Sequence, residues 1–584
     1  MAPAPSAAHR CCAQLVAPAS MAGPIAVRST QFGGGITSAD RTADVVVIGG
    51  GPGGSTTATM LARQGFEVLL LERERFPRDH IGESLLPASI PVLEELGVLP
   101  AVQQAGFLQK WGATMVWGTD KTPWSWYFRE TNHKYPHSYQ VWRPLFDQLL
   151  LENSRVHGVD VREGHQVVDV LWADGRAVGV RYTANGTDGV AQARFVVDAS
   201  GQGALLGRKL QLRRWDAFFQ NLAIYAYCTG ARRLPAPDAS NIFIESYAHG
   251  WFWHIPLHTG WTSVGAVVDS RTGQEGIRRR GPLRFLLDQV AQAPHTTQML
   301  HEATLVSGPF VLRDWSYISD EVVGDGYILV GDAACFVDPL FSSGVHLALM
   351  AGVLAAAYVT TALKDPGMQE AAGCVYKELY YKEYDHFRSM AQLFYSSNRT
   401  VESYFWEARR LLGAEEQLSP RHAFIRAVAG QPPRGYERVV LEHGQAPMQF
   451  VDSVHIVEAE RTARRARLAA VVRSHADITR TPLYHAVPRL APGIQVQRKP
   501  VIAAGEFVWG DVLITAGYPE GVPCSRLVAQ MVSLIDGHRS VAELLARLCE
   551  GRDETQGTQI ATSALTALQI LYVDGTIADL PGEE

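Results

Sequence analysis

The sequence predicts an α/β protein whose central domain is a dinucleotide-binding fold. Three observations predict it: an apolar run at residues 44–48, a glycine-rich turn directly after it, and a helical pattern followed by a second apolar run, EVLLLERE. Strand, glycine turn, helix and strand in this order form the unit that binds a dinucleotide in a parallel sheet. A chain of 584 residues is too long for one core, so we expect two or three domains.

The glycine-rich turn carries the pattern GxGxxG at Gly49, Gly51 and Gly54. Gly49 permits the tight turn, Gly51 lets the backbone approach a pyrophosphate, and Gly54 lets helix and strand pack closely. The N–H groups at the start of the helix would face the phosphates. Glu72 ends the second apolar run, where a carboxylate binds the hydroxyls of a ribose.

Composition and charge indicate a globular protein, with 47% hydrophobic and 19% charged residues. A net charge of −6 gives no general attraction to nucleic acid or anionic lipid. No apolar run reaches the roughly 18 residues that a membrane span requires, so we expect a soluble protein. The seven cysteines are scattered without CxxC or metal-ligand spacing, which favours a reducing cytoplasm and no bound metal.

A second strand-and-turn segment, DGYILVGDAACFVDP, places an apolar strand at 327–330 before Asp332 and Pro339. It resembles the second FAD signature of glutathione-reductase-like flavoproteins of the hydroxylase type, in which the aspartate of the GD pair binds the ribityl chain. FVVDASG at 195–201 resembles the middle motif of these proteins, and Arg143 matches an arginine beside the cofactor. The resemblance implies FAD as the cofactor and this flavoprotein fold for the domain.

The run GWFWHIP at 250–256 alternates large apolar residues. Trp251, Trp253 and Ile255 would point to the same side of a strand with one buried face, and Pro256 follows them. Taken alone, this pattern is typical of a core strand. In the context of the FAD motifs, it resembles the WxWxIP signature of flavin-dependent halogenases.

Three further segments resemble the same family: FPRDHIGESLLP at 76–87, GFLQKWGATMVWG at 106–118 and GDAACFVDPLFSSGVHLA at 331–348. The resemblance is greatest to the branch acting on substrates other than free tryptophan, including halogenases of chloramphenicol-type and polyketide antibiotic pathways. It implies an enzyme that makes HOCl from a flavin hydroperoxide and chloride. The two indoles and the proline would then form a wall between flavin and substrate that suppresses hydroxylation.

Lys110 stands at the position of the family's essential lysine, which would deliver electrophilic chlorine to the substrate. Most lone lysines are solvated surface charges. This one is flanked by Phe107, Leu108 and Trp111, and the chain has only eight lysines against 45 arginines. A lysine in apolar surroundings loses its proton more easily and can act as a nucleophile or donate hydrogen bonds to HOCl. A lysine chloramine and lysine-bound HOCl both remain open.

The turn DPLFSSGV is built from small residues, and successive backbone N–H groups in such a turn form an anion-binding nest. The family match assigns chloride to the amides of Ser343 and Gly344. An ordinary glycine turn that opens a helix is the alternative. Tryptophan halogenases carry a glutamate in this loop where the present chain has Phe341, so no catalytic acid is assigned and free tryptophan is not the expected substrate.

The remaining sequence predicts helices and a small additional domain. A helical pattern at 376–406 repeats Tyr380, Tyr384, Phe387 and Phe394, which favours a core stripe over a substrate wall. From about residue 505 the pattern is helix, turn, helix, then helix and short hairpin. It is similar to small winged-helix domains, including the peptide-binding chaperone domain of pyrroloquinoline-quinone biosynthesis. Four basic against twelve acidic residues disfavour DNA binding there and favour packing or protein docking.

We therefore expect four parts along the chain. They are a disordered tail over residues 1–40, an FAD-binding halogenase core with an inserted substrate-side β-sheet over 41–365, a helical extension and linker over 366–500, and the winged-helix-like domain over 505–584.

The expected activity is FADH2-dependent chlorination in antibiotic biosynthesis, with reduced flavin supplied by a separate NAD(P)H-dependent flavin reductase. Electrophilic chlorine needs an electron-rich carbon, so a phenolic aromatic polyketide such as a tetracycline-like scaffold is the first substrate class. An acyl group tethered to a carrier protein or coenzyme A is the second. The alternatives are a flavin-dependent aromatic monooxygenase, a prenyl-lipid-type reductase, and a non-catalytic FAD-containing scaffold.

Overall fold

The computed structural model describes residues 41–118, 121–313, 315–396, 463–464, 466–468, 481–515 and 518–579. The chain divides into two compact units, which are described separately. The first contains the described residues up to 396 together with Ala504–Phe507, and the second contains the other described residues. The tail expected over residues 1–40 lies outside the described residues.

The first unit is organised around a mostly parallel sheet in the order β18-β19-β10-β1-β2-β7, which β8 and β9 extend. Strand β1 lies at its centre because Val45, Val46 and Val47 are apolar and are buried on both faces between β2 and β10. The strands are β1 (Arg41–Ile48), β2 (Val68–Glu72), β7 (Asp160–Glu163), β8 (His165–Ala173), β9 (Arg176–Ala184), β10 (Thr187–Asp198), β18 (Val323–Gly324) and β19 (Tyr327–Leu329).

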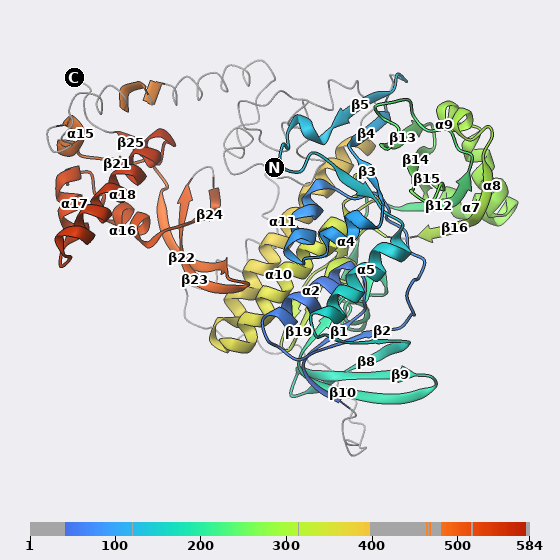
Figure 1. Ribbon diagram of the computed structural model, residues 1–584, viewed down its shortest axis with the longest axis horizontal. Helices are drawn as coiled ribbons and strands as arrows, with labels where there is room; N and C mark the ends of the chain where they lie inside the picture. Colours follow the sequence, from blue (N-terminus) through green and yellow to red (C-terminus); the bar gives the residue numbers. More distant parts are fainter. Residues whose placement is uncertain are drawn as a thin grey trace. The chain divides into compact units, whose positions relative to one another are not determined.

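Helices α2 (Pro52–Arg63), α5 (Arg143–Val156), α10 (Gly344–Lys364) and α11 (Gln369–Ser396) pack on this sheet (Figure 1). Helix α10 approaches α2 closely, since a Cβ on Gly352 would lie 2.8 Å from the carbonyl oxygen of Gly53. The hydroxyl of Thr57 also donates to the Gly352 carbonyl at 3.3 Å. Helix α10, almost 300 residues further along the chain, therefore packs against the helix that follows the glycine-rich turn.

The aromatic stripe of α11 is part of this core, as the sequence predicts. Tyr380, Tyr384, Phe387 and Phe394 are all buried. The hydroxyl of Tyr380 donates to the carbonyl oxygen of Gly331 at 3.0 Å, beside the second cofactor segment. The boundary expected at residue 365 is therefore too early, because α11 belongs with the FAD-binding core and not with a separate extension.

Helix α10 is long and apolar enough for a membrane span by length and composition, although no uninterrupted apolar run in the chain reaches about 18 residues. Among the described residues, Gly344–Lys364 is one helix of that length and composition, with a mean hydropathy of 1.7 over its most apolar window. However, 89% of that window is buried inside the protein, as in the core helices of soluble proteins.

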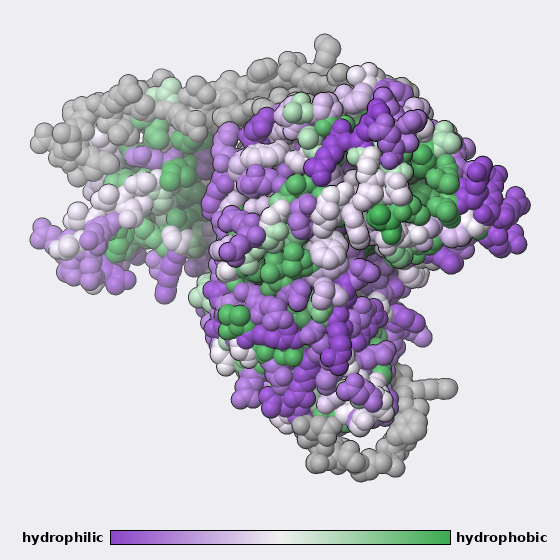
Figure 2. Space-filling view, turned by 45° about the vertical axis from the view of Figure 1, so that its right-hand side comes forward, coloured by the Kyte–Doolittle hydropathy of each residue, from purple (hydrophilic) through white to green (hydrophobic). Residues whose placement is uncertain are grey.

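On the face in Figure 2, apolar residues form separate patches among hydrophilic ones.

A second sheet in the first unit has the order β16-β12-β15-β14-β13-β4-β5. Helices α7 (Ser270–Arg280), α8 (Pro282–Val290) and α9 (Pro294–Met299) cover one of its faces (Figure 1). Its strands are β4 (Gly112–Val116), β5 (Trp124–Tyr127), β12 (Asn221–Thr229), β13 (Ile242–Tyr247), β14 (Gly250–Pro256), β15 (Thr262–Asp269) and β16 (Thr304–Arg313).

The expectation of one buried face is wrong for β14. Trp251, Trp253 and Ile255 do share a face, but Phe252 and His254 on the opposite face are buried as well. Phe252 packs with the hydrophobic cluster that includes Phe285 of α8. The strand is buried on both faces because it is central in its sheet and covered by helices on the side opposite the indoles.

Smaller elements complete the first unit. A two-stranded sheet pairs β3 (Leu108–Lys110) with β6 (Ser138–Gln140), and a three-stranded sheet joins β11 (Arg213–Trp215), β17 (Tyr317–Ser319) and β20 (Cys335–Phe336). The short helices are α3 (Ile90–Glu95), α4 (Leu99–Gln104), α6 (Leu205–Lys209) and the 3₁₀ turns η2 (Pro87–Ser89), η3 (Phe128–Glu130), η4 (Gly201–Gly203), η5 (Gly331–Ala333) and η6 (Pro366–Met368).

The second unit combines a three-stranded sheet with a helical cluster. Its elements are α15 (Pro482–His485), β21 (Arg489–Leu490), β22 (Gln495–Ala503), all but the first two residues of β23 (Glu506–Thr515), β24 (Tyr518–Cys524), α16 (Arg526–Leu534), α17 (Val541–Cys549), α18 (Glu554–Val573) and β25 (Ile577–Asp579). Two details differ from expectation. The hydrophobic core reaches back to Leu483, before the expected boundary at 505, and β25 pairs with β21 instead of forming a local hairpin.

Replacing the third glycine of the turn tests the close packing of this fold. Gly54→Ala would place a Cβ 2.0 Å from the carbonyl oxygen of Gly49, so the turn and helix must separate. We expect a loss of about 1–3 kcal/mol in stability, measured by thermal unfolding, together with weaker FAD binding. Gly203→Ala is the control, since a Cβ there meets nothing within 4 Å. Equal effects of the two substitutions would contradict the packing argument.

Candidate active site

The glycine-rich turn between β1 and α2 leaves one side open for a ligand. Gly49 has a φ of +97°, and a Cβ there would lie 2.5 Å from the carbonyl oxygen of Ala199. Gly51, the N-cap of α2, is different: a Cβ on Gly51 would meet only the Arg78 guanidinium, at 3.5 Å. The first N–H groups of a helix have no intrahelical acceptor, so this opening suits a phosphate group.

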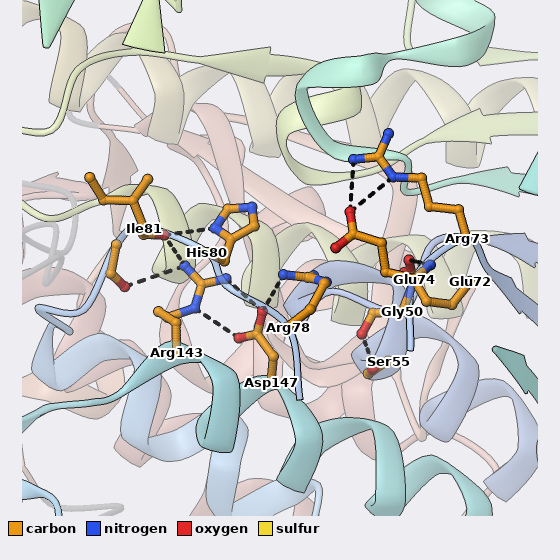
Figure 3. A network of polar contacts seen from close by, with 11 residues as sticks. Gly50, Ser55, Glu72, Arg73, Glu74, Arg78, His80, Ile81, Arg143 and Asp147 are labelled. Carbon is orange, nitrogen blue, oxygen red and sulfur yellow. Dashed lines mark hydrogen bonds and ion pairs between the residues drawn. The ribbon is translucent and has the colours of Figure 1, made fainter. Parts of the chain in front are cut away.

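Glu72 lies where the sequence predicts, at the end of β2 beside the turn. Its carboxylate accepts the N–H of Gly50 at 2.7 Å and that of Glu74 at 2.8 Å (Figure 3). These two hydrogen bonds fix the orientation of the carboxylate. An ionised carboxylate has about four acceptor positions, so Glu72 keeps the capacity to accept ribose hydroxyls.

Arg143 is the first residue of α5 and forms a buried ion pair with Asp147. Its Nε and Nη2 donate to the two carboxylate oxygens at 2.8 and 2.9 Å (Figure 3). Burial opposes ionisation of Asp147, but the Arg143 guanidinium keeps its pKa below the ordinary value. A bidentate pair of this kind holds the guanidinium in one orientation beside the cofactor segments.

Arg78 is a functional candidate that the sequence reading missed. It lies in the loop after β2, over the Phe76 ring at 4.6 Å, and its Nη1 is 3.3 Å from Asp147. Its Nη2 faces Gly51. An arginine above the open side of the turn is suited to a pyrophosphate. The available signal was the arginine within FPRDHIGE, inside a segment already matched to the family.

Asp332 and Pro339 follow β19, in the second cofactor segment. Asp332 lies in the turn η5 and is within electrostatic range of Arg143. Burial raises its pKa to about 7, while Arg143 and Arg213 act in the opposite direction. Pro339 is partly buried in the loop that leads to α10.

These residues fit FAD on structural grounds. The opening at Gly51 and the guanidinium of Arg78 suit the pyrophosphate, and Glu72 suits the adenosine ribose. Arg143 lies within electrostatic range of Asp332, which belongs to the second FAD signature. The site thus combines a phosphate-binding turn with acidic and basic groups at the places where a dinucleotide needs them.

One extended segment, residues 81–85, connects the cofactor arginine to the lysine. Nη1 of Arg143 donates to the carbonyl oxygens of Ile81 and Gly82 (Figure 3). Nζ of Lys110 donates to the carbonyl oxygen of Leu85 at 3.0 Å. Because both basic side chains hydrogen-bond to one short segment, Arg143 and Lys110 are held at a fixed spacing.

A buried glutamate in the middle of this segment is a second residue that the sequence reading missed. Glu83 is 1% exposed, and its carboxylate accepts the Tyr227 hydroxyl at 2.8 Å. Its carbonyl oxygen also accepts the N–H of Val141 at 2.7 Å. Tyr227 belongs to β12, so this pair joins the segment 81–85 to the second sheet.

Lys110 ends strand β3 and is 2% exposed, so it is a buried amine and not a surface charge. Its Nζ lies 5.5 Å from the centre of the Phe128 ring. Burial lowers the pKa of Lys110 from 10.5 to about 7. Near neutral pH a substantial fraction of this amine therefore carries a free lone pair.

Three residues of the WxWxIP segment, Trp251, Trp253 and Ile255, lie on the face of the second sheet opposite α7–α9. Trp251 and Trp253 have ring centres 6.0 Å apart, and Trp253 is 6.1 Å from the ring of Tyr225 on β12. Ile255 and Pro256 continue along β14 toward its other end. Five residue steps along the strand, roughly 17 Å, separate Trp251 from Pro256, so the four residues do not converge on one point. By alternation along the strand, Pro256 belongs to the face opposite the two indoles.

The loop before α10 has the backbone geometry of an anion-binding nest. Ser342 has a φ of +59°, in the left-handed region, and Ser343 follows in the right-handed helical region. Ser343 is the N-cap and Gly344 the first residue of α10, so their N–H groups lie at the positive end of a long helix. Phe341, where tryptophan halogenases carry a glutamate, is buried against Phe394 at 5.1 Å.

Two protein-family models match this chain, one for FAD-dependent oxidoreductases and one that is more specific. The first matches residues 44–208, and the second, described as tryptophan halogenase, matches residues 128–446. A tryptophan 2-halogenase of Chondromyces crocatus is 36% identical over 378 residues, covering 64% of this chain and 71% of that protein. The 1H-pyrrole-2-carbonyl-[peptidyl-carrier protein] chlorinase of Pseudomonas fluorescens is 32% identical over 397 residues, covering 63% and 87%.

Two solved structures give the same result. The myxobacterial chondrochloren halogenase CndH matches with a TM-score of 0.59 and 40% identity, over 71% of this chain and 96% of that one. The flavin-dependent halogenase CmlS matches with a TM-score of 0.65 and 26% identity, over 91% of this chain and 96% of that one. Because the match to CmlS covers 91% of this chain, it includes residues of the second unit as well as the first.

The fold and the site define an FAD-dependent oxidoreductase of the glutathione-reductase-like type. Within that class, the chain belongs to the tryptophan halogenase family and is a flavin-dependent halogenase.

Burial of Lys110 predicts a stability that depends on pH. Between about pH 7 and 10.5 the folded state holds this amine neutral, whereas the unfolded chain is protonated. The unfolded state then binds more protons, so stability rises with pH across this window, by up to ~1.4 kcal/mol per unit. In Lys110→Met this contribution is absent.

We therefore expect Lys110→Met to gain stability relative to the wild type at pH 7, and the gain to shrink toward pH 9.5. Chemical denaturation at several pH values measures it. Lys110→Met also removes the hydrogen bond to the Leu85 carbonyl oxygen, which affects stability at both pH 7 and pH 9.5. The change with pH in the stability difference between variant and wild type is therefore the diagnostic quantity. A difference in stability that is constant with pH would show that the amine is not neutral in the folded protein.

Proposed function

We propose that this halogenase chlorinates an electron-rich aromatic carbon and that Lys110 delivers the chlorine. The observation that carries the proposal is the buried Lys110 amine, anchored by the Leu85 carbonyl on the same segment that binds Arg143. When bound as reduced FAD, the cofactor supplies with oxygen the oxidising power that converts chloride to HOCl. A separate NAD(P)H-dependent flavin reductase provides the reduced flavin.

The loop of residues 340–344, here called the halide loop, suits chloride electrostatically. The N–H groups of Ser343 and Gly344 start a helix of 21 residues, and the helix dipole adds positive potential at this end. Chloride needs donors but no specific geometry, so two amides in a nest are a suitable site. Phe341 and Phe394 supply an apolar neighbour that limits competing water.

Lys110 offers two ways to transfer chlorine. As a neutral amine it attacks HOCl: an N–Cl bond forms, the Cl–O bond breaks, and the products are the chloramine and water. The chloramine then gives Cl⁺ to the ring carbon, whose proton returns to the amine. As an ammonium, Lys110 would instead donate hydrogen bonds to HOCl, which reacts directly. A pKa of about 7 makes the first route available at physiological pH.

Trp251, Trp253, Ile255 and Pro256 would separate the oxidation site from the organic substrate. Two adjacent indoles on a strand buried on both faces have little freedom to move aside. A rigid wall favours passage of a molecule as small as HOCl over that of an aromatic ring. This is the property that distinguishes a halogenase from a hydroxylase on the same fold.

The substrate is proposed as a phenolic ring, such as that of an aromatic polyketide in antibiotic biosynthesis. A ring carried as a thioester on a carrier protein is the second candidate. The similarity to a chlorinase whose name specifies a pyrrole-2-carbonyl group on a peptidyl-carrier protein supports it, since the matched region covers 87% of that protein. Phenols and pyrroles share the electron-rich carbon that electrophilic chlorine requires.

Lys110→Ala tests the relay. We expect chlorinated product to fall by at least 100-fold, because the amine is lost, while FADH2 oxidation continues at a similar rate. Product is measured by mass spectrometry and flavin oxidation by absorbance. Lys209→Ala removes an exposed lysine of α6 and serves as the control. Retained chlorination in Lys110→Ala would refute the role of the amine.

The pH profile of the same assay separates the two routes. Transfer through a neutral amine should rise with pH through about 7 and then level off, whereas transfer through an ammonium should fall across the same range. A flat profile for the wild type would contradict both.

Paired substrates test the second choice. A phenol is offered free, and a pyrrole-2-carboxyl group is offered both free and as a carrier-protein thioester. We expect chlorination of the free phenol. Chlorination of the thioester alone would assign the enzyme to carrier-bound substrates, and hydroxylation without chlorination of any of them would contradict the proposed function.

A further inference from the structure

Three of the matched motif regions meet at the last turn of α11, which belongs to none of them. Nε1 of Trp117, from the lysine segment, donates to the carbonyl oxygen of Phe394 at 3.1 Å. Phe341, from the halide loop, packs edge-on against the Phe394 ring at 5.1 Å. Trp251, from the WxWxIP strand, donates to the neighbouring residue, Tyr395. The end of α11 is thus a junction between the lysine, indole and halide segments.

A chain of two hydrogen bonds passes through this junction. Nε1 of Trp251 donates to the Tyr395 hydroxyl at 2.6 Å. That hydroxyl in turn donates to Oδ2 of Asp338 at 2.9 Å. The tyrosine therefore uses its acceptor and its donor on two different segments.

Asp338 connects the chain to the halide loop. It is 2% exposed, and its Oδ1 accepts the N–H of Leu340 at 2.9 Å. The loop from Leu340 to Gly344 follows directly and contains the left-handed residue Ser342. Burial raises the pKa of Asp338 to about 7, although the hydrogen bonds from Leu340 and Tyr395 oppose the rise. These donors favour the carboxylate form.

We propose that Tyr395 is a positioning residue that joins the indole wall at Trp251 to the halide loop through Asp338. The inference rests on the proposed role of that loop in binding halide. The hydroxyl of Tyr395 holds the Asp338 carboxylate, which holds the start of the loop, so the nest and the wall keep one relative position. Without the hydroxyl, Asp338 loses a donor and Trp251 loses its acceptor.

Tyr395→Phe tests the proposal, with Tyr376→Phe as the matched control. Tyr376 is also a buried tyrosine of α11, but its hydroxyl donates to the carbonyl oxygen of Leu329, away from the loop. Bromide and chloride are titrated into the oxidised, FAD-loaded protein and followed by flavin absorbance, without turnover. We expect the halide dissociation constant to rise about tenfold in Tyr395→Phe, equivalent to ~1.4 kcal/mol, and to stay unchanged in Tyr376→Phe.

Further readouts separate positioning from a general loss of structure. FAD affinity should be unchanged in Tyr395→Phe, and in turnover the KM for chloride should rise while the KM for FADH2 does not. Tryptophan fluorescence should change in Tyr395→Phe through Trp251. Adding Asp338→Asn to Tyr395→Phe should weaken halide binding little beyond either single change, because the two residues act as one unit.

Equal halide affinities of Tyr395→Phe and Tyr376→Phe would overturn the inference and leave the proposed function intact. A parallel loss of FAD affinity in Tyr395→Phe would also overturn it, since the residue would then be merely structural. If the wild type shows no saturable halide binding, the proposed halide loop fails, and this inference fails with it.

Discussion

The active site depends on the hydrogen bonds that two basic side chains make to one extended segment. Residues 81–85 offer carbonyl oxygens to Arg143 at one end and to Lys110 at the other. A buried cation is costly without compensation, and the two residues obtain it differently. Arg143 has the carboxylate of Asp147, so it stays charged. Lys110 donates to a neutral carbonyl oxygen instead, and burial lowers its pKa. The protein thus holds one permanent cation for an anionic cofactor and one amine that can change its protonation state.

The second sheet fixes the positions of the two indoles of β14, which are proposed to form a wall. Helices α7–α9 bury one of its faces through Phe252 and its neighbours, which leaves Trp251 and Trp253 on the other face. Each indole N–H is also bonded, to Tyr395 and to Ser263. An aromatic side chain that is both packed and hydrogen-bonded has one orientation. The pair of Glu83 and Tyr227 then ties this sheet to the segment 81–85.

The loop proposed to bind halide is placed by contacts on several sides. Helix α10 begins immediately after it and packs against the glycine turn through Gly352. Asp338 holds its first residues, and α11 closes it through Phe394. The strained φ of Ser342 persists because these surroundings determine the backbone there. The proximity of cofactor segment, halide loop and indole strand is thus a property of the packed core.

The sequence by itself determined the cofactor half of the site. Glycines that need a particular φ or a close approach, apolar strands, and an acid at a strand end are local features, so Gly49, Gly54 and Glu72 could be placed without a fold. Family motifs in the sequence also predict roles for Lys110, Trp251 and Ser343. Local periodicity could not show that β14 is buried on both faces, nor that β25 pairs with β21, because both depend on which elements pack together. Arg78, Glu83 and Tyr395 acquire their significance only from partners distant in the chain, such as Trp251, which lies 144 residues before Tyr395. Tertiary structure alone decided these contacts, because a hydrogen bond between remote residues leaves no spacing pattern in the sequence.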